Sequence, residues 1–272
     1  MLTFDRVEKS YGDVRALHSV SFEVRRDEIV ALLGPNGAGK TTALEIALGL
    51  RAVDGGSVNL FGDTPRDAAV RRRLGATPQE SGFPDMLRVD EIAGFTAAHY
   101  PNPVPLAETL DRFGLASLAR RRAGTLSGGE SRRLALALAF AGNPEFVVLD
   151  EPTTGLDVES RRRLWEVVGD LGEGRSILFT THYLEEAQAL ATRIVVIDRG
   201  RVLFDGDPEK LRARVGGRRL SYVGADGHVS LLVEDADEYV RTMVGAGVAF
   251  SNLEIARPSL EEAFLTLTGG TQ

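Results

Sequence analysis

The hydrophobic positions near the start of the chain predict short strands followed by a helix. A fully apolar run, Ile29–Leu33, ends in a glycine-rich loop, and the residues after the loop, 41–48, form a helix-favouring run. Two earlier strands are predicted at Leu2–Phe4 and Val20–Val24. We therefore expect a β-rich start whose third strand leads through a tight loop into a helix.

The middle of the chain changes to helical patterns, after which apolar strands return. Helices are predicted at Arg66–Leu74, Val89–His99, Pro105–Phe113, Gly128–Ala141, Glu159–Leu171 and Tyr183–Ala191. Two apolar strands, 146–149 and 176–179, alternate with the last of these helices. Such alternation is typical of an α/β fold with a parallel sheet, and residues from about 86 to 142 read as a helical subdomain inserted into it.

The last part of the chain has a different order of elements. After residues 201–206 the α/β pattern is complete, and from about Gly216 the order becomes strand, strand, helix, strand, helix. Ser259 and Glu262 form a capping box for the final helix. We therefore expect a main domain at 1–215 and a small C-terminal α+β appendage at 216–272.

Composition narrows the class of protein. The 272 residues are 43% hydrophobic, as in a folded globular chain, and the net charge of −7 gives no general attraction for nucleic acid. The basic clusters, such as Arg132–Arg133, are expected to be solvated helix faces. With no cysteine and four widely separated histidines, a zinc site is not expected. No apolar run approaches the ~20 residues that span a bilayer, so a cytoplasmic chain is expected.

The loop after the third strand has the composition of a phosphate-binding loop. Its residues are Gly34, Pro35, Asn36, Gly37, Ala38, Gly39, Lys40, Thr41 and Thr42. Glycines let successive backbone N–H groups turn toward an anion, and the helix N-terminus adds its partial positive charge. In such a loop the lysine reaches the β- and γ-phosphates and the Thr41 hydroxyl can ligate Mg²⁺. Because a strand precedes and a helix follows the loop, a nucleoside triphosphate site is favoured over a flexible turn.

Polar residues follow two later strands at the point where each ends. Asp150 and Glu151 follow an apolar run, and His182 lies just past the next strand. Ligands of parallel sheets bind at the carboxyl ends of strands, where an aspartate can hold Mg²⁺ and a glutamate can take a proton from water. The plainer alternatives are two solvated turn acids and a structural histidine.

Two further features have two interpretations each, and a third has one plain interpretation. Ser127 and Glu130 fit a capping box, but the intervening Gly128 and Gly129 are poor helix residues and suggest close approach of another group, with the helix N-terminus as a second anion site. Tyr11 could stack on a purine or lie on the surface of a turn. Gln79, alone, is most simply an exposed loop glutamine.

Together these residues carry a family resemblance. The order of the phosphate loop, Gln79, Leu126–Glu130, Val147–Glu151, Gly155–Asp157 and His182 resembles the nucleotide-binding subunit of an ATP-binding-cassette (ABC) transporter. The resemblance covers roughly residues 1–215. It implies a P-loop NTPase (RecA-like) core with an antiparallel β subdomain, and an ATPase that uses ATP and Mg²⁺. The ending, 258–269, looks like that of ATPases serving daunorubicin-type exporters, although a generic dimer-stabilising appendage is an alternative.

The resemblance also implies a role for each position. Tyr11 would stack on adenine, Lys40 would contact the phosphates, and Thr41 and Gln79 would hold Mg²⁺. Asp150 would bind the metal through water, Glu151 would be the general base, and His182 would hold the γ-phosphate. Ser127, Gly128 and Gly129 would close on ATP held by a second subunit, which places Asp157 at the seam of a homodimer.

The resemblance implies a partner as well, and it has one departure and two rivals. A separate integral membrane permease would carry the cargo, so the chain would lie on the inner face of the cell membrane. Glu130 stands where the family usually has glutamine, and we expect it to turn away as the capping-box acid. The rivals are a soluble, non-transport cassette ATPase of the iron–sulfur assembly type and a nucleic-acid-handling or translation-associated cassette. The acidic, single-cassette chain argues against the latter.

Overall fold

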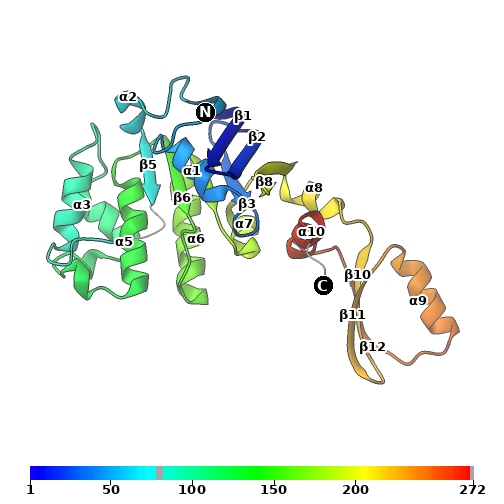
Figure 1. Cartoon of the computed structure of the whole chain (residues 1–272). Coiled ribbons are helices and arrows are strands. Elements are labelled where there is room, and N and C mark those ends of the chain that lie inside the picture. Colours follow the sequence, from blue (N-terminus) through cyan, green and yellow to red (C-terminus); the bar gives the residue numbers. More distant parts are fainter. Residues whose placement is uncertain (78–81, 270–272) are drawn as a thin grey trace. The chain divides into compact units, whose positions relative to one another are not determined.

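A six-stranded sheet forms the layer to which the loops expected to bind nucleotide are attached (Figure 1). The computed structural model describes residues 1–77 and 82–269. The sheet has the order β5 (Leu74–Thr77), β6 (Phe146–Asp150), β7 (Ser176–Thr180), β3 (Ile29–Leu33), β8 (Arg193–Asp198) and β9 (Arg201–Gly206). The first five of these strands run parallel. Since β6, β7 and β3 are neighbours, their carboxyl ends lie along one edge of the sheet.

A smaller antiparallel sheet stands beside the first helix. It has the order β2 (Val14–Val24), β1 (Leu2–Tyr11) and β4 (Gly55–Leu60). Leu2 pairs with Val24 on one side and with Leu60 on the other, and all three side chains are fully buried. They share a hydrophobic core with the buried residues of α1 (Lys40–Ala47). This core anchors the helix that begins at the phosphate loop.

The remaining helices of residues 1–205 surround the parallel sheet or form the helical segment, at about residues 86–142. They are α2 (Ala68–Arg71), α3 (Val89–Ala97), α4 (Leu106–Arg112), α5 (Gly128–Ala141), α6 (Val158–Gly172) and α7 (Leu184–Leu190), with short 3₁₀ turns at Ala116–Leu118 and Ala123–Thr125. Helix α5 packs so closely on β5 that a Cβ on Gly75 would collide with the carbonyl oxygen of Ala139. This contact joins the helical segment to the edge of the sheet.

The chain divides into two compact units, residues 1–205 and 206–272. The second contains α8 (Pro208–Ala213), α9 (Ala236–Gly245) and α10 (Leu260–Leu267), together with the antiparallel sheet β11 (Gly227–Val233), β10 (Arg218–Gly224) and β12 (Ser251–Ala256). Ser259 and Glu262 make the reciprocal hydrogen bonds of the expected capping box. Arg219 of the central strand forms an ion pair with Glu262, which ties α10 to the sheet.

The structure corrects two expectations about elements. The helix predicted at Arg66–Leu74 is only α2, because Leu74 already pairs with Phe146 as the first residue of β5. Strand β1 continues to Tyr11, well past the predicted end at Phe4, because its second half keeps pairing with β2. The α/β class with an antiparallel sheet, a helical segment and a C-terminal α+β unit is as expected.

Candidate nucleotide site

The phosphate loop connects β3 directly to α1. Gly39 is the N-cap of α1 with φ 105°, and no side chain caps the helix. A Cβ on Gly34 would collide with the carbonyl oxygen of Ile197, and a Cβ on Gly39 would lie 2.7 Å from that of Ala16. Glycine is therefore required at both positions for this loop to pack against β8 and β2. The uncapped helix end leaves backbone N–H groups of the first turn free to bind an anion.

Lys40 lies across the loop. Its Nζ donates to the carbonyl oxygens of Gly34 (2.7 Å) and Pro35 (3.0 Å). Burial lowers the pKa of Lys40, and the nearby charges of Glu151 and Asp150 oppose that shift. The ammonium group thus occupies the mouth of a loop that faces the two acids. The following Thr41 is an exposed residue in the first turn of α1.

Asp150 ends a strand in which every residue is buried. Its Oδ1 accepts a 2.5 Å hydrogen bond from the Thr180 hydroxyl at the end of neighbouring β7. Burial raises the pKa of Asp150, while the Thr180 hydrogen bond works in the opposite direction. A carboxylate and a threonine hydroxyl, such as that of Thr41, are oxygen ligands, which Mg²⁺ prefers. Among the residues at 1–77 and 82–269, no group of three or more His, Cys, Asp and Glu side chains could hold a metal, so phosphate oxygens and water would complete such a site.

Glu151 has a strained backbone and meets the expected histidine. Its φ is 45°, a left-handed conformation that is uncommon for a residue other than glycine. Its Oε2 accepts from the Thr154 hydroxyl at 3.0 Å and lies 3.3 Å from Nδ1 of His182. The left-handed turn therefore aims the carboxylate toward the loop after β7. Strain of this kind persists where the surrounding structure holds it, and it is concentrated at functional sites.

Arg132 of α5 hydrogen-bonds to the backbone of the acidic turn, which comprises residues 150–154. Its guanidinium donates to the backbone carbonyl oxygens of Asp150 (2.5 Å), Glu151 and Pro152 (3.0 Å). Arg132 is only 8% exposed, and burial lowers its pKa. The expectation that the Arg132–Arg133 cluster is a solvated face was therefore wrong for Arg132. The sequence did contain one sign that Arg132 is buried, because it lies one turn before Leu136 on the apolar stripe of the helix.

The start of α5 confirms the expected capping box. Ser127 Oγ accepts from the Glu130 N–H at 3.2 Å, and Glu130 Oε2 accepts from the Ser127 N–H at 2.7 Å. These hydrogen bonds, chiefly the one from the Ser127 backbone, lower the pKa of Glu130, and Arg121 lies 3.2 Å from its other oxygen. A Cβ on Gly128 would meet nothing within 4 Å. The described part of this chain thus leaves open space beside Gly128.

Two further predicted residues, Tyr11 and Asp157, lie at the ends of β1 and α6. Tyr11 is 41% exposed at the end of β1, with Lys9 and Arg51 each within 5.8 Å of its ring centre, so both interpretations of this residue stay open. Asp157 caps α6 through Ser160 (2.9 Å), and this bond lowers the pKa of Asp157. Gln79 lies outside the residues that the structure describes.

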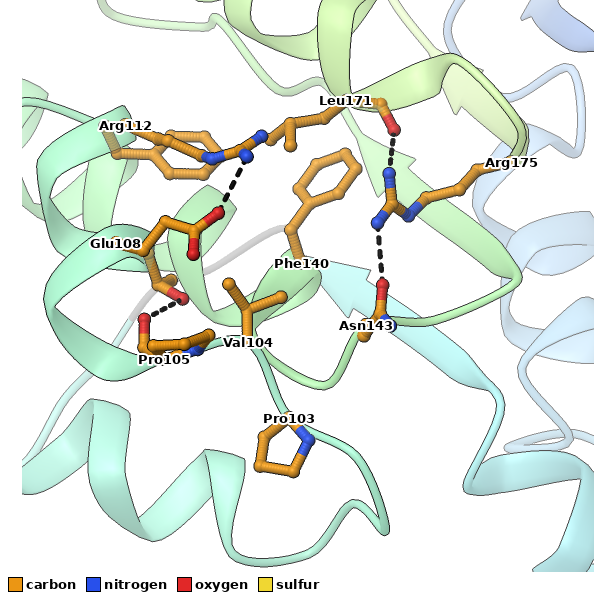
Figure 2. A pocket seen from close by; sticks show the side chains of 11 residues that line it. Pro103, Val104, Pro105, Glu108, Arg112, Phe140, Asn143, Leu171 and Arg175 are labelled. Carbon is orange, nitrogen blue, oxygen red and sulfur yellow. Dashed lines mark hydrogen bonds and ion pairs between the residues drawn. The ribbon is translucent and has the colours of Figure 1, made fainter.

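A separate hollow of about 280 Å³ lies where the helical segment meets the ends of α5 and α6 (Figure 2). Val104, Phe140 and Leu171 form apolar walls, and Arg175 is held at its rim by Leu171 O (2.6 Å) and Asn143 Oδ1 (2.7 Å). None of its lining residues belongs to the phosphate loop or to the acidic turn. The hollow is therefore distinct from the candidate nucleotide site.

Comparison with known proteins agrees with this geometry. Residues 17–154 match the family described as ABC transporter. The chain is 36% identical to the daunorubicin resistance ATP-binding protein DrrA3 of Streptomyces coeruleorubidus, covering 98% of this chain and 96% of that one. It is 38% identical to the Nod factor export ATP-binding protein I of Paraburkholderia xenovorans, covering 98% and 97%.

Solved structures give the same assignment. The ATP-binding cassette MJ0796, in a dimeric post-hydrolysis state with ADP and Pi, superposes with a TM-score of 0.70 at 26% identity and covers 76% of this chain and 98% of its own. An ATP-binding subunit of an ABC transporter gives a TM-score of 0.72 at 27% identity, covering 79% and 93%. These matches, together with the phosphate loop and the acidic turn, show that the chain belongs to the ABC transporter family, as one of its ATP-binding and ATP-hydrolysing subunits.

Proposed function

We propose that this ATPase works as a homodimer beneath a separate membrane permease and drives export of a drug-like or otherwise hydrophobic compound. The observation that carries the catalytic part is the 3.3 Å approach of His182 Nδ1 to Glu151 Oε2, one strand away from the phosphate loop. The export direction is supported by the names of the relatives, which are a daunorubicin resistance protein and a Nod factor export protein.

In this proposal the phosphate loop binds the triphosphate of ATP. Lys40 exchanges its two carbonyl acceptors for β- and γ-phosphate oxygens, and the free amides of the first turn of α1 hold the same anion. Thr41, Gln79 and Asp150 would hold Mg²⁺ in this site. When bound, the metal neutralises phosphate charge as the γ-phosphoryl group is transferred.

Glu151 is the general base and His182 the group that holds the γ-phosphate. Glu151 is one quarter exposed, so water can reach its carboxylate, while Thr154 fixes one of its oxygens. An ionised carboxylate can orient a water molecule and take its proton as the γ-phosphorus is attacked. The left-handed turn at Glu151 and the Arg132 contacts hold this base in place.

The other half of each site comes from a second subunit. Ser127, Gly128 and Gly129 form the start of α5, where the space beside Gly128 is open, and the dimeric cassette structure with ADP and Pi supports a paired arrangement. Tyr11 stacks on adenine in this proposal, and Asp157 lies at the seam. The functional cassette is residues 1–215, its helical subdomain is about 86–142, and the appendage is 216–272.

The membrane component is supplied by another polypeptide in this proposal. Within residues 1–77 and 82–269, no helix is long and apolar enough to cross a bilayer. ATP is drawn from the cytoplasm, so the chain docks on the inner face of the cell membrane. The names of the relatives favour this transporter role over the iron–sulfur assembly alternative.

Capture of the membrane partner tests the proposal. The tagged chain, as wild type and as Glu151→Gln, is recovered with Mg-ATP from detergent-solubilised membranes of its source cells, and partners are identified by mass spectrometry. We expect a protein with several membrane spans, and inside-out vesicles carrying both chains should accumulate daunorubicin in an ATP-dependent way. Recovery of soluble assembly or ribosomal proteins alone would contradict the transport role and leave the ATPase activity intact.

A further inference from the structure

A buried carboxyl group joins the two loops that carry the proposed catalytic pair. Glu186 of α7 is fully buried, and its Oε1 accepts hydrogen bonds from the Thr153 hydroxyl and from the Trp165 indole N–H, each at 3.0 Å. Thr153 lies two residues after Glu151, and Trp165 lies on α6. One carboxyl oxygen therefore connects the acidic turn, α6 and α7.

The same glutamate lies on the helix that follows His182. Thr181 Oγ1 accepts from the Tyr183 N–H at 2.9 Å, and the Glu186 N–H donates to Tyr183 O at 3.0 Å. These bonds build the turn that presents His182 immediately before α7 begins. Displacement of the Glu186 side chain would thus move the histidine turn relative to the acidic turn.

Helix α6 makes a second contact with this turn. The Arg161 guanidinium lies 4.0 Å from the centre of the Tyr183 ring, whose own centre lies 3.9 Å from that of His182. Arg161 and Trp165 are four residues apart, so they project from the same face of the helix. Helix α6 therefore supports the histidine turn at two points, once through Tyr183 and once through Glu186.

A carboxyl group is a costly choice for this place if packing is its only purpose. Burial without full hydrogen bonding is unfavourable, and Oε2 of Glu186 has no hydrogen-bond partner within the described residues. An apolar side chain would fill the space without that cost but could not accept from Thr153 and Trp165. Polar groups in a core specify one arrangement of their neighbours, and here those neighbours are the segments beside Glu151 and His182.

We infer that Glu186 is a positioning residue for ATP hydrolysis, which sets the separation of Glu151 and His182 through its contacts with Thr153 and Trp165. The inference rests on the proposed roles of Glu151 and His182. Glu186 does not touch the nucleotide in this account. It acts only by fixing the position of the acidic turn relative to the turn that carries His182.

Substitutions in the full-length chain separate positioning from general destabilisation. Glu186→Leu removes the oxygen that accepts from Thr153 and Trp165, and Glu186→Gln keeps one such oxygen. Thr153→Val removes only the hydroxyl that donates to Glu186. Exposed Glu185, the neighbour of Glu186, supplies the control Glu185→Gln. The measurements are kcat for Mg-ATP hydrolysis, Kd for Mg-ATP by calorimetry, and the emission spectrum of Trp165, the sole tryptophan of the chain.

For Glu186→Leu we expect kcat to fall roughly 10- to 100-fold, as for other small misplacements of reacting groups, with Kd within about twofold of wild type. Glu186→Gln should recover most of kcat, and the Trp165 emission should change in Glu186→Leu only. Thr153→Val should lower kcat by about threefold or more, and it decides the question if Glu186→Leu does not fold.

Two results would overturn the inference. One is a folded Glu186→Leu protein, or failing that Thr153→Val, with the kcat of wild type. The other is a fall in kcat matched by an equal weakening of ATP binding, because that would indicate general disruption of the site. Failure of the proposed function can be distinguished from failure of this inference. In that case Glu151→Gln would hydrolyse ATP at the wild-type rate, independently of the effect of the Glu186 substitutions.

Discussion

Arg132 Nη2 donates a 2.5 Å hydrogen bond to the backbone carbonyl oxygen of Asp150, so the first turns of α5 and the end of β6 are directly joined. The same guanidinium reaches the next two carbonyl oxygens. Residues Ser127 to Gly129, which are proposed to meet a partner's ATP, therefore belong to a helix that also supports this chain's own acidic turn. Events at the start of α5 can reach Glu151 through one side chain.

Replacement of Arg132 by lysine should damage both stability and catalysis. A lysine carries its three donors on a single nitrogen at the end of a shorter side chain, so it cannot reproduce the planar, multi-nitrogen contact with three carbonyl oxygens. We expect the free energy of unfolding to fall by about 1.5–3 kcal/mol, measured by urea denaturation, and kcat to fall roughly tenfold as Glu151 loses its support. The neighbouring half-exposed Arg133 provides the control, and Arg133→Lys should leave both quantities near wild type. Unchanged kcat in Arg132→Lys would refute the support role.

Glu151→Gln should separate ATP binding from hydrolysis. Glutamine keeps the shape of the side chain but cannot take a proton from water, and loss of a general base costs about 10²–10⁴ in rate. Hydrolysis is measured by phosphate release and binding by calorimetry, for which we expect an unchanged Kd. Exposed Glu159 of α6 provides the control Glu159→Gln, with normal turnover. Turnover of Glu151→Gln at the wild-type rate would remove Glu151 from its proposed role.

Asp150→Asn should weaken the use of Mg²⁺ while leaving the fold intact. Asparagine can still accept from Thr180, and it avoids burial of a charge, so stability without metal should be equal or higher. We expect the Mg²⁺ concentration for half-maximal ATPase activity to rise about 10- to 100-fold, the usual cost of losing a supporting ligand. Chelation of Mg²⁺ with EDTA should abolish hydrolysis in every variant. An unchanged Mg²⁺ titration would contradict the assignment, and Asp170→Asn on the exposed face of α6 should have the Mg²⁺ titration of wild type.

The local parts of the site were predictable because their signals are local. The bounds of β3 and α5 coincide with the expected ones, and both capping boxes form as their residue spacing indicates. The strand-end rule also placed the acids and His182 at one edge of the sheet. In each case residues close in sequence determine the local conformation. The sheet order β6-β7-β3 then brings the phosphate loop, the acids and His182 together.

The contacts between distant segments were not predictable. Arg132 was predicted to be a surface charge because a run of basic residues does not indicate that three carbonyl oxygens of another segment will accept hydrogen bonds from it. Glu186 is separated from Trp165 by 21 residues and from Thr153 by 33, so no spacing rule relates them. The strand β8 carries an apolar pattern, yet its insertion beside β3 depends on the whole sheet. Tertiary packing determines these positions.

A double-mutant cycle tests whether Arg121 neutralises Glu130. Glutamine at 130 still completes the capping box, so Glu130→Gln alone should change turnover by less than about threefold. Arg121→Met leaves the carboxylate without its 3.2 Å partner and should slow turnover about two- to fivefold. That loss should disappear when both substitutions are combined. Steady-state ATPase assays decide the matter, and a tenfold or greater acceleration by Glu130→Gln would show that capping is not the role of this acid.

The pH dependence of stability should change when Glu186 is replaced by glutamine. Burial raises the pKa of Glu186 above its ordinary value of 4.5, while contacts with Thr181, Thr153 and Trp165 and the charge of Arg161 oppose the shift. The folded chain therefore holds this proton more tightly than the unfolded chain does. Its contribution to stability is fully present below pH 4.5 and is lost as the pH rises through the folded pKa, with a slope of at most about 1.4 kcal/mol per pH unit.

Glutamine does not titrate, so Glu186→Gln should gain on wild type as the pH rises from 4.5 toward 7.5. The measurement is the free energy of urea unfolding at several pH values in that window, because the difference between the two chains cancels the other titrating groups. Glu185→Gln, one residue away on the exposed side of α7, should instead run parallel to wild type. Parallel curves for Glu186→Gln would show that Glu186 is ionised in the folded protein, with Thr153 and Trp165 donating to a charged carboxylate.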